Sequence, residues 1–125
     1  MPLLSYDRKV VPNGAGTSTR ILGQYVRDEG LLSLSDAIAR LSLYPAQRME
    51  KFAPAFAQKG RIAVGADADV VVFDPATVAA QASYEAPFEP PTGMHSVWVA
   101  GQLSAQHGQL LEGAGVGQKL IADTR

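Results

Sequence analysis

The chain has 125 residues, a formal net charge of −1 and no cysteine. This length suffices for one folded domain, and the absence of cysteine excludes disulfides, thiolate nucleophiles and cysteine-based zinc sites. The near-neutral charge offers no electrostatic surface for nucleic acid or for an anionic membrane, and no apolar run is long enough to span a bilayer. Because the amino-terminal residues lack the pattern of a signal peptide, we expect a cytoplasmic location.

The first half of the chain has the periodicity of helices. Residues 1–16 contain several prolines and glycines and no clear period, which predicts a loop. Apolar residues then recur with helical spacing over 17–29. The hydroxyl residues at 17–19 can cap the start of this helix, and Gly30 is placed to end it.

Two shorter helices are predicted next. Ser33 followed by Asp36 has the spacing of a helix cap, which predicts the start of a helix over 34–43. Pro45 suits the first turn of a third helix, over 45–52.

From residue 60 the periodicity changes from that of helices to that of strands. A glycine-containing turn separates the first two predicted strands, and a tight turn at Gly101 and Gln102 makes a hairpin of the next two. The predicted strands are 61–64, 69–73, 96–100 and 103–106, with a further short strand at 109–111. Helices followed by strands define an α+β chain with a boundary near residue 60.

The stretch "GRIAVGADADVVVFDP", residues 60–75, contains aspartates that could belong to a metal-binding loop. A calcium loop of the EF-hand type needs a glycine after its acidic positions and a late glutamate, and neither is present. We therefore interpret Asp67 as a turn residue, Asp69 as the entry to a strand and Asp74 as its end. The strand is apolar on both faces, which predicts that it is covered on both sides.

The two histidines, His95 and His107, lie on either side of the predicted hairpin and could approach each other. Zinc sites need further ligands close by, so we interpret both as surface or turn residues. A small independent hydrolase that uses either histidine is kept as an alternative. The sequence contains no phosphate-binding loop and no nucleophile elbow, so its residues alone define no catalytic group.

Three segments together resemble the C-terminal end of a metal-dependent amidohydrolase, in the N-acyl-D-amino-acid deacylase branch of that superfamily. They are "GAGTSTRILGQYVRDEGLLSLSDAIARLSLYPAQRME" at 14–50, "KGRIAVGADADVVVFDP" at 59–75 and "ASYEAPFEPPTGMHSVWVAGQLSAQHGQLLEGAGVGQ" at 82–118. The segments follow the order of the family and cover nearly the whole chain.

The resemblance implies a fold in which a TIM-type barrel is joined to a small β-sandwich. Residues 17–59 would be the last helices of a truncated barrel, and residues 60–125 the C-terminal portion of the sandwich with an irregular tail. Residues 1–16 would leave the active-site face of the barrel. This placement makes three residues candidates for substrate proximity, namely Tyr6, Arg8 and Lys9.

The family binds zinc through an H-x-H pair, further histidines and a bridging residue, all on earlier barrel strands that have no counterpart here. Its catalytic aspartate, in an S-D-G motif, would fall just before Met1. Relatives often carry H-P-R where this chain has "VVPN". We therefore expect a fragment or truncated product of an enzyme that hydrolyses non-peptide C–N bonds, as in N-acyl amino acids. We expect no metal or catalytic residue in this chain and no activity by itself, and zinc in a full-length member.

The alternative is a non-catalytic α+β interaction module. In both interpretations the strands would have unpaired edges, and the apolar helix faces would lack a barrel. We therefore predict a homo-oligomer, or pairing with a separate chain that supplies the missing N-terminal barrel portion. We expect no nucleic-acid or membrane partner.

Overall fold

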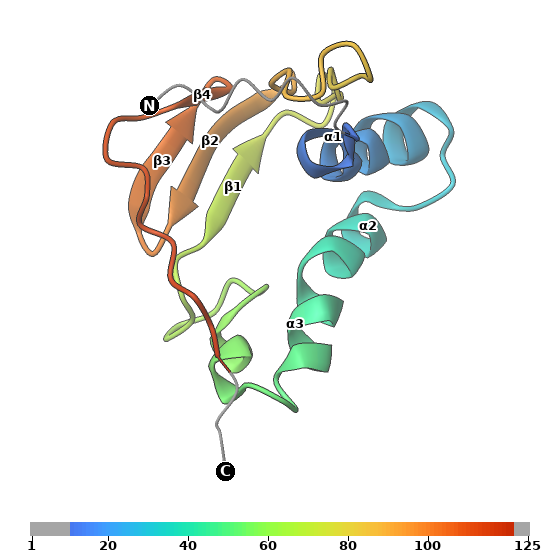
Figure 1. Cartoon of the computed structure of the whole chain (residues 1–125). Helices are drawn as coiled ribbons and strands as arrows, with labels where there is room; N and C mark the ends of the chain where they lie inside the picture. The colour runs from blue at the N-terminus through green and yellow to red at the C-terminus, as the bar shows by residue number, and fades with distance from the viewer. Residues whose placement is uncertain (1–10, 122–125) are drawn as a thin grey trace.

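The computed structural model describes residues 11–121 and has an α+β fold, with helices on one side and an antiparallel sheet on the other (Figure 1). No helix within residues 11–121 is long and apolar enough to cross a membrane. The α-helices are α1 (Asn13–Arg20), α2 (Leu34–Leu41) and α3 (Leu43–Met49). A π-helix, η1 (Ile21–Asp28), continues α1, and a short 3-10 helix, η2 (Pro54–Gln58), follows α3. The strands are β1 (Val70–Phe73), β2 (Met94–Val99), β3 (Gln102–Gln106) and β4 (Gln109–Leu110).

The first helix starts at Asn13, so the predicted loop over residues 13–16 is wrong. The predicted hydroxyl cap is also wrong, because Pro12 stands at the N-cap without a side-chain hydrogen bond. Thr17 lies inside the helix, where its hydroxyl donates to the Asn13 carbonyl at 2.7 Å. Glycine is tolerated here because the helix lies close to a neighbouring segment: Gly16 is buried, and a Cβ at Gly16 would lie 3.4 Å from that of Ala82.

The ends of the next elements follow the sequence prediction. The helix that continues through η1 is followed by Gly30, whose φ of +62° is left-handed, as predicted for a helix stop. The Ser33 hydroxyl accepts a hydrogen bond from the Asp36 N–H at 3.1 Å, which confirms the predicted cap of α2. A third helix is also present with Pro45 in its first turn, but it spans Leu43–Met49 and not the predicted 45–52.

The sheet has the strand order β1-β2-β3-β4, and every neighbouring pair is antiparallel. The predicted hairpin is formed by β2 and β3, but its turn is one residue earlier than predicted. Ala100 (φ +50°) and Gly101 (φ +79°) form this turn, and positive φ at both central residues matches the right-handed twist of a two-residue hairpin.

Two strand predictions are wrong. Residues 61–64 form no strand, because Arg61 turns back to donate to the Lys59 carbonyl and to Glu50, at 3.0 and 3.1 Å. β1 is a strand, but it is not covered on both sides: Val71 is 50% exposed and Val72 is 46% exposed. Val71 and Val72 point to opposite faces of the strand, so neither face of β1 is fully covered by the described residues.

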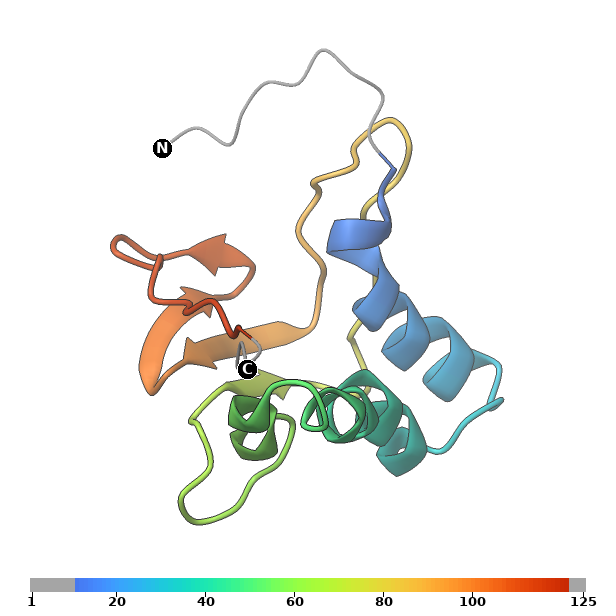
Figure 2. The same ribbon diagram turned by 60° about the horizontal axis from the view of Figure 1, so that its bottom comes forward.

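The core lies where the helices meet the segment between β1 and β2. Leu22, Ala37 and Val78 are buried there, and Phe73 and Met94 from the sheet pack against them. Segment 74–93 runs beside the first helix and then returns to the sheet, which Figure 2 shows from below.

Two glycines make this arrangement possible. A Cβ at Gly23 would lie 2.4 Å from the Val78 carbonyl oxygen, and a Cβ at Gly93 would lie 2.4 Å from the Val78 nitrogen. The backbone of Val78 is therefore held between two residues that have no side chain. We call Gly23, Val78 and Gly93 the Val78 seam.

Candidate functional site

The residues predicted to lie near substrate, Tyr6, Arg8 and Lys9, fall outside the described residues. The described chain begins beside a hollow of about 490 Å³ between the first helix and residues 82–85. Its polar lining residues are Asn13, Thr17, Arg20, Tyr25, Ser83, Tyr84 and Glu85.

The wall of this hollow contains both polar and apolar side chains. Arg20 and Glu85 bring charges of opposite sign to its wall, and Tyr25 and Tyr84 add two phenol groups. Its described lining contains no histidine that could act as a base for Ser83. The described lining therefore contains no pairing of a serine nucleophile with a histidine base.

The aspartates of residues 60–75 have structural roles, as predicted. Lys59 Nζ lies 2.9 Å from Asp67 Oδ2 and 2.6 Å from Asp69 Oδ2, so an ammonium group occupies the position between these carboxylates. The other oxygen of Asp69 accepts the Ala100 N–H at 2.8 Å. Asp69 therefore joins the start of β1 both to the helical half and to the hairpin turn.

These contacts shift the pKa values of Asp69 and Lys59. The hydrogen bond from Lys59 lowers the pKa of Asp69 below its ordinary value, and the Ala100 N–H acts in the same direction. The hydrogen bonds to Asp67 and Asp69 raise the pKa of Lys59. The stabilisation from Asp69 is thus present above the ordinary carboxyl pKa and is lost as the pH falls through the lowered folded-state value. The stabilisation from Lys59 is present below the ordinary lysine pKa and is lost as the pH rises through the raised pKa of Lys59 in the folded state.

Replacing Asp69 with asparagine is expected to lower the free energy of unfolding at pH 7 by about 1 kcal/mol, since partial exposure screens the charges. The difference from the unmodified protein should vanish at a pH below the lowered pKa of Asp69, where the carboxyl is neutral in both states. Urea unfolding at a series of pH values measures this.

Asp67→Asn is the matched control. Asp67 contacts the same lysine but is more exposed than Asp69, and among residues 11–121 no backbone N–H donates to its carboxylate as the Ala100 N–H does to Asp69. We expect a smaller loss of stability for this variant. Equal losses for both variants would contradict the role assigned to the Ala100 contact.

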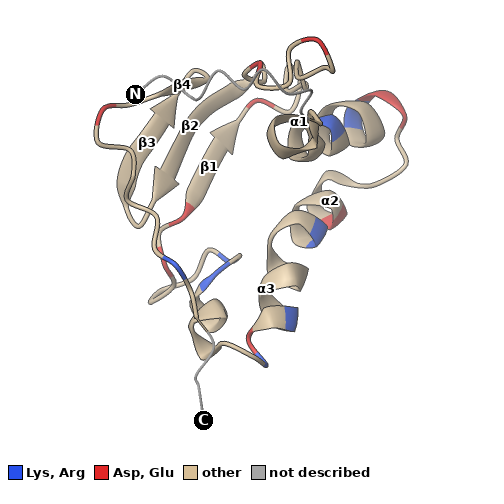
Figure 3. Ribbon diagram, viewed as in Figure 1, with Lys and Arg blue, Asp and Glu red and all other residues tan. Residues whose placement is uncertain are grey.

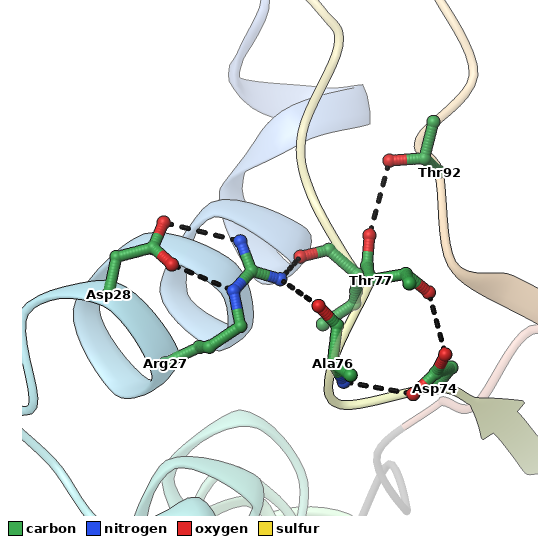
Figure 4. Close-up of polar contacts among 7 residues, drawn as sticks. Arg27, Asp28, Asp74, Ala76, Thr77 and Thr92 are labelled. Carbon is green, nitrogen blue, oxygen red and sulfur yellow. Dashed lines mark hydrogen bonds and ion pairs between the residues drawn. The ribbon is translucent and has the colours of Figure 1, made fainter.

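Asp74 ends β1 and organises the turn that follows, as predicted. Its carboxylate accepts the Ala76 N–H and the Thr77 hydroxyl, both at 2.9 Å. Its carbonyl accepts the Val78 N–H at 2.9 Å. Figure 4 shows this turn and the neighbouring Thr92.

Arg27, which no sequence motif indicated, fastens the first helix to this turn (Figure 4). Its guanidinium donates to the Val78 carbonyl at 2.7 Å and to the Ala76 carbonyl at 3.3 Å. Asp28 holds the guanidinium from the other side, with Nε to Oδ1 at 2.7 Å. The hydrogen bond between these side chains raises the pKa of Arg27 and lowers that of Asp28. Arg27 is thus a structural residue that satisfies carbonyls near the core.

The structure brings the two histidines together. His95 on β2 and His107 in the turn between β3 and β4 have ring centroids 4.7 Å apart, in a T-shaped arrangement. No group of three or more His, Cys, Asp or Glu that could hold a metal ion occurs within residues 11–121. The described part of the chain therefore does not supply a zinc site of the kind that the resemblance implies.

Comparison with known proteins agrees with the resemblance. The profile of the amidohydrolase family matches residues 6–105. A D-aminoacylase of Alcaligenes xylosoxydans xylosoxydans is 42% identical over 98 residues, which are 78% of this chain and 19% of the relative. An N-acyl-D-glutamate deacylase of the same organism is 44% identical over 98 residues, with the same shares of the two chains.

Solved structures give the same result. A crystal structure of D-aminoacylase superimposes with a TM-score of 0.76 at 36% identity, and covers 88% of this chain and 22% of its own. The N-acyl-D-glutamate deacylase of Bordetella bronchiseptica, solved with zinc and a phosphonate inhibitor, has a TM-score of 0.78 at 38% identity. That match covers 91% of this chain and 23% of the other.

The chain belongs to the amidohydrolase family. Within that family it falls in the N-acyl-D-amino-acid deacylase branch, as the sequence resemblance predicted. It spans about a fifth of the length of these relatives, 19% of each of the two curated proteins.

Proposed function

We propose that this chain is the C-terminal portion of an N-acyl-D-amino-acid deacylase. The enzyme would hydrolyse the amide bond of an N-acyl-D-amino acid at a zinc site formed by residues outside this chain. The observation that carries the proposal is the 42–44% identity to deacylases over 98 residues. The described residues do not provide the ligands for zinc, so we assign no chemical step to them.

The exposed apolar surface supports a partner that covers it. Ile62 and Val64 are almost fully exposed, although both are large and apolar, and Val71 and Val72 of β1 are half-exposed. Such side chains in a segment rich in strand-forming residues are typical of an interface. We propose that helices α1 to α3 pack on the rest of a TIM-type barrel and that the sheet belongs to a β-sandwich.

The distribution of charge is consistent with that arrangement. Figure 3 shows Lys, Arg, Asp and Glu on the helices and loops, while the ribbons of the four strands carry none. β1 is an edge strand, and natural sheets usually protect free edges with charges. An uncharged edge fits a strand that pairs with another strand in the complete enzyme. In that enzyme, Tyr6, Arg8 and Lys9 would lie near substrate.

A chimeric enzyme tests the proposal. In it, the segment of the Alcaligenes D-aminoacylase that matches this chain is replaced by the corresponding residues of this chain. We expect the chimera to bind zinc and to release free amino acid from an N-acyl-D-amino acid. We expect the purified 125-residue chain, supplied with zinc, to release none.

The matched control is the D-aminoacylase lacking the same segment, which should fold poorly and be inactive. Hydrolysis by the 125-residue chain alone would overturn the proposal that the zinc site lies elsewhere. A chimera that folds and binds zinc but cleaves no N-acyl-D-amino acid would overturn the proposal that this chain is the C-terminal portion of such a deacylase.

A second proposal is a non-catalytic module that self-associates or binds a separate chain, and the same exposed residues favour it. Sedimentation of the purified chain distinguishes the two. A defined dimer that buries Ile62 and Val64 would support the module. Association that disappears when the barrel portion of a relative is added would support the deacylase.

A further inference from the structure

His95 and His107 are held beside each other by the backbone. The His107 N–H donates to the His95 carbonyl at 3.0 Å, across the β2–β3 pair. His107 has a left-handed φ of +48°, and Gly108 follows with +79°, so a tight turn fixes where the His107 ring projects. Both histidines are exposed, and their ring centroids are 4.7 Å apart.

Neither imidazole makes a side-chain hydrogen bond or ion pair with any residue that the structure describes. Both border a hollow of about 270 Å³, whose other walls are Asp74, Gly93 and Met94. The carboxylate of Asp74 is engaged by Ala76 and Thr77. Two adjacent imidazoles therefore border the hollow, and neutral imidazole can donate a nitrogen lone pair to a metal ion.

We propose that His95 and His107 together chelate a divalent transition-metal ion such as Cu²⁺, Ni²⁺ or Zn²⁺. Neutral imidazole suits these ions, whereas Mg²⁺ and Ca²⁺ prefer oxygen ligands. Two ring nitrogens at about 2.0–2.1 Å from one ion require adjacent imidazoles, which the turn supplies after a small rotation of the rings. Water completes the coordination, because no third ligand is grouped with the pair within residues 11–121. The site is separate from the proposed catalytic zinc site, for which residues 11–121 contain no ligand group.

Nickel binding by the untagged 125-residue chain tests the site. The variants are His95→Gln, His107→Asn and the double replacement. Asparagine is chosen for position 107 because it tolerates a left-handed backbone better than glutamine. We expect each single variant to lower the Ni²⁺ affinity by about tenfold or more. Only one imidazole then binds the ion, and the second bond, which formed within the same molecule, is lost. The double variant should be little worse than either single variant.

Equal Ni²⁺ binding by the unmodified protein and the double variant would overturn the proposal. Single variants that bind half as much Ni²⁺ with unchanged affinity would also overturn it, since each imidazole would then bind its own ion. If a variant does not fold, electron paramagnetic resonance of the unmodified protein with one equivalent of Cu²⁺ decides. Coupling to two nitrogens supports the chelate, and coupling to one contradicts it. None of these readouts depends on deacylase activity.

Discussion

Replacing Gly23 with alanine is expected to lower the free energy of unfolding by about 2–3 kcal/mol, although alanine normally favours a helix. The new Cβ would lie 2.4 Å from the Val78 carbonyl oxygen and 3.3 Å from the Ala79 Cα. Both are backbone atoms, so no side-chain rotation can relieve the overlap. The helix would have to move away from segment 74–93 and would weaken the bond between Arg27 and the Val78 carbonyl.

Gly14→Ala is the control, because Gly14 lies in the first turn of α1, which continues into η1, and nothing lies within 4 Å of its added Cβ. There we expect a gain of about 0.5–1 kcal/mol from helix propensity alone. Urea denaturation of both variants gives the comparison. A similar change in stability for the two would show that the helix does not approach Val78 as closely as described.

Replacing Gly93 with alanine is expected to cost about 3 kcal/mol or more, the largest effect of the substitutions considered, because strain and overlap add. Gly93 has a φ of +73°, and its Cβ would lie 2.4 Å from the Val78 nitrogen and 2.5 Å from the Val78 Cα. The substitution would open the Val78 seam from the side of the sheet and separate Met94 from the core.

Gly113→Ala separates the two causes. Gly113 has a nearly identical φ of +77°, but nothing lies within 4 Å of its added Cβ. We expect it to cost only the strain of a left-handed alanine, about 1 kcal/mol. Thermal unfolding of the pair measures the difference. If Gly113→Ala destabilises as much as Gly93→Ala, crowding at Val78 contributes nothing.

Local signals in the sequence predicted the ends of elements well. The cap at Ser33 and the stop at Gly30 depend on atoms within a few residues, so their chemistry can be read from the order of residues. The failure at 61–64 has a different cause. Alternating apolar residues show that a segment can pair, but pairing requires a neighbouring strand, and here Arg61 is held by Glu50 instead. The coverage of β1 failed for another reason: apolar residues on both faces show that a strand can be buried, but not which element covers it.

The roles of Asp67, Asp69 and Asp74 could be predicted, because turn chemistry is local. The role of Arg27 could not, since its partners lie 49 and 51 residues away. One signal was available: Gly23 and Arg27 are four residues apart and share a helix face. A glycine at 23 lets another backbone segment approach this face closely, and the arginine at 27 can then donate hydrogen bonds to the carbonyls of that segment. The positions of Tyr6, Arg8 and Lys9 stay predictions.

The path of segment 74–93 affects how the chain could be cut. Residues 83–89 form a local turn in which Ala86 and Ser83 bond each other, and Tyr84 and Phe88 are exposed. A break in this turn would leave β1 on one piece and β2 on the other, still joined by their antiparallel ladder. We therefore expect this surface turn to accept new chain termini most readily. The same position should accept an inserted reporter domain, or division of the chain into two fragments that reassociate.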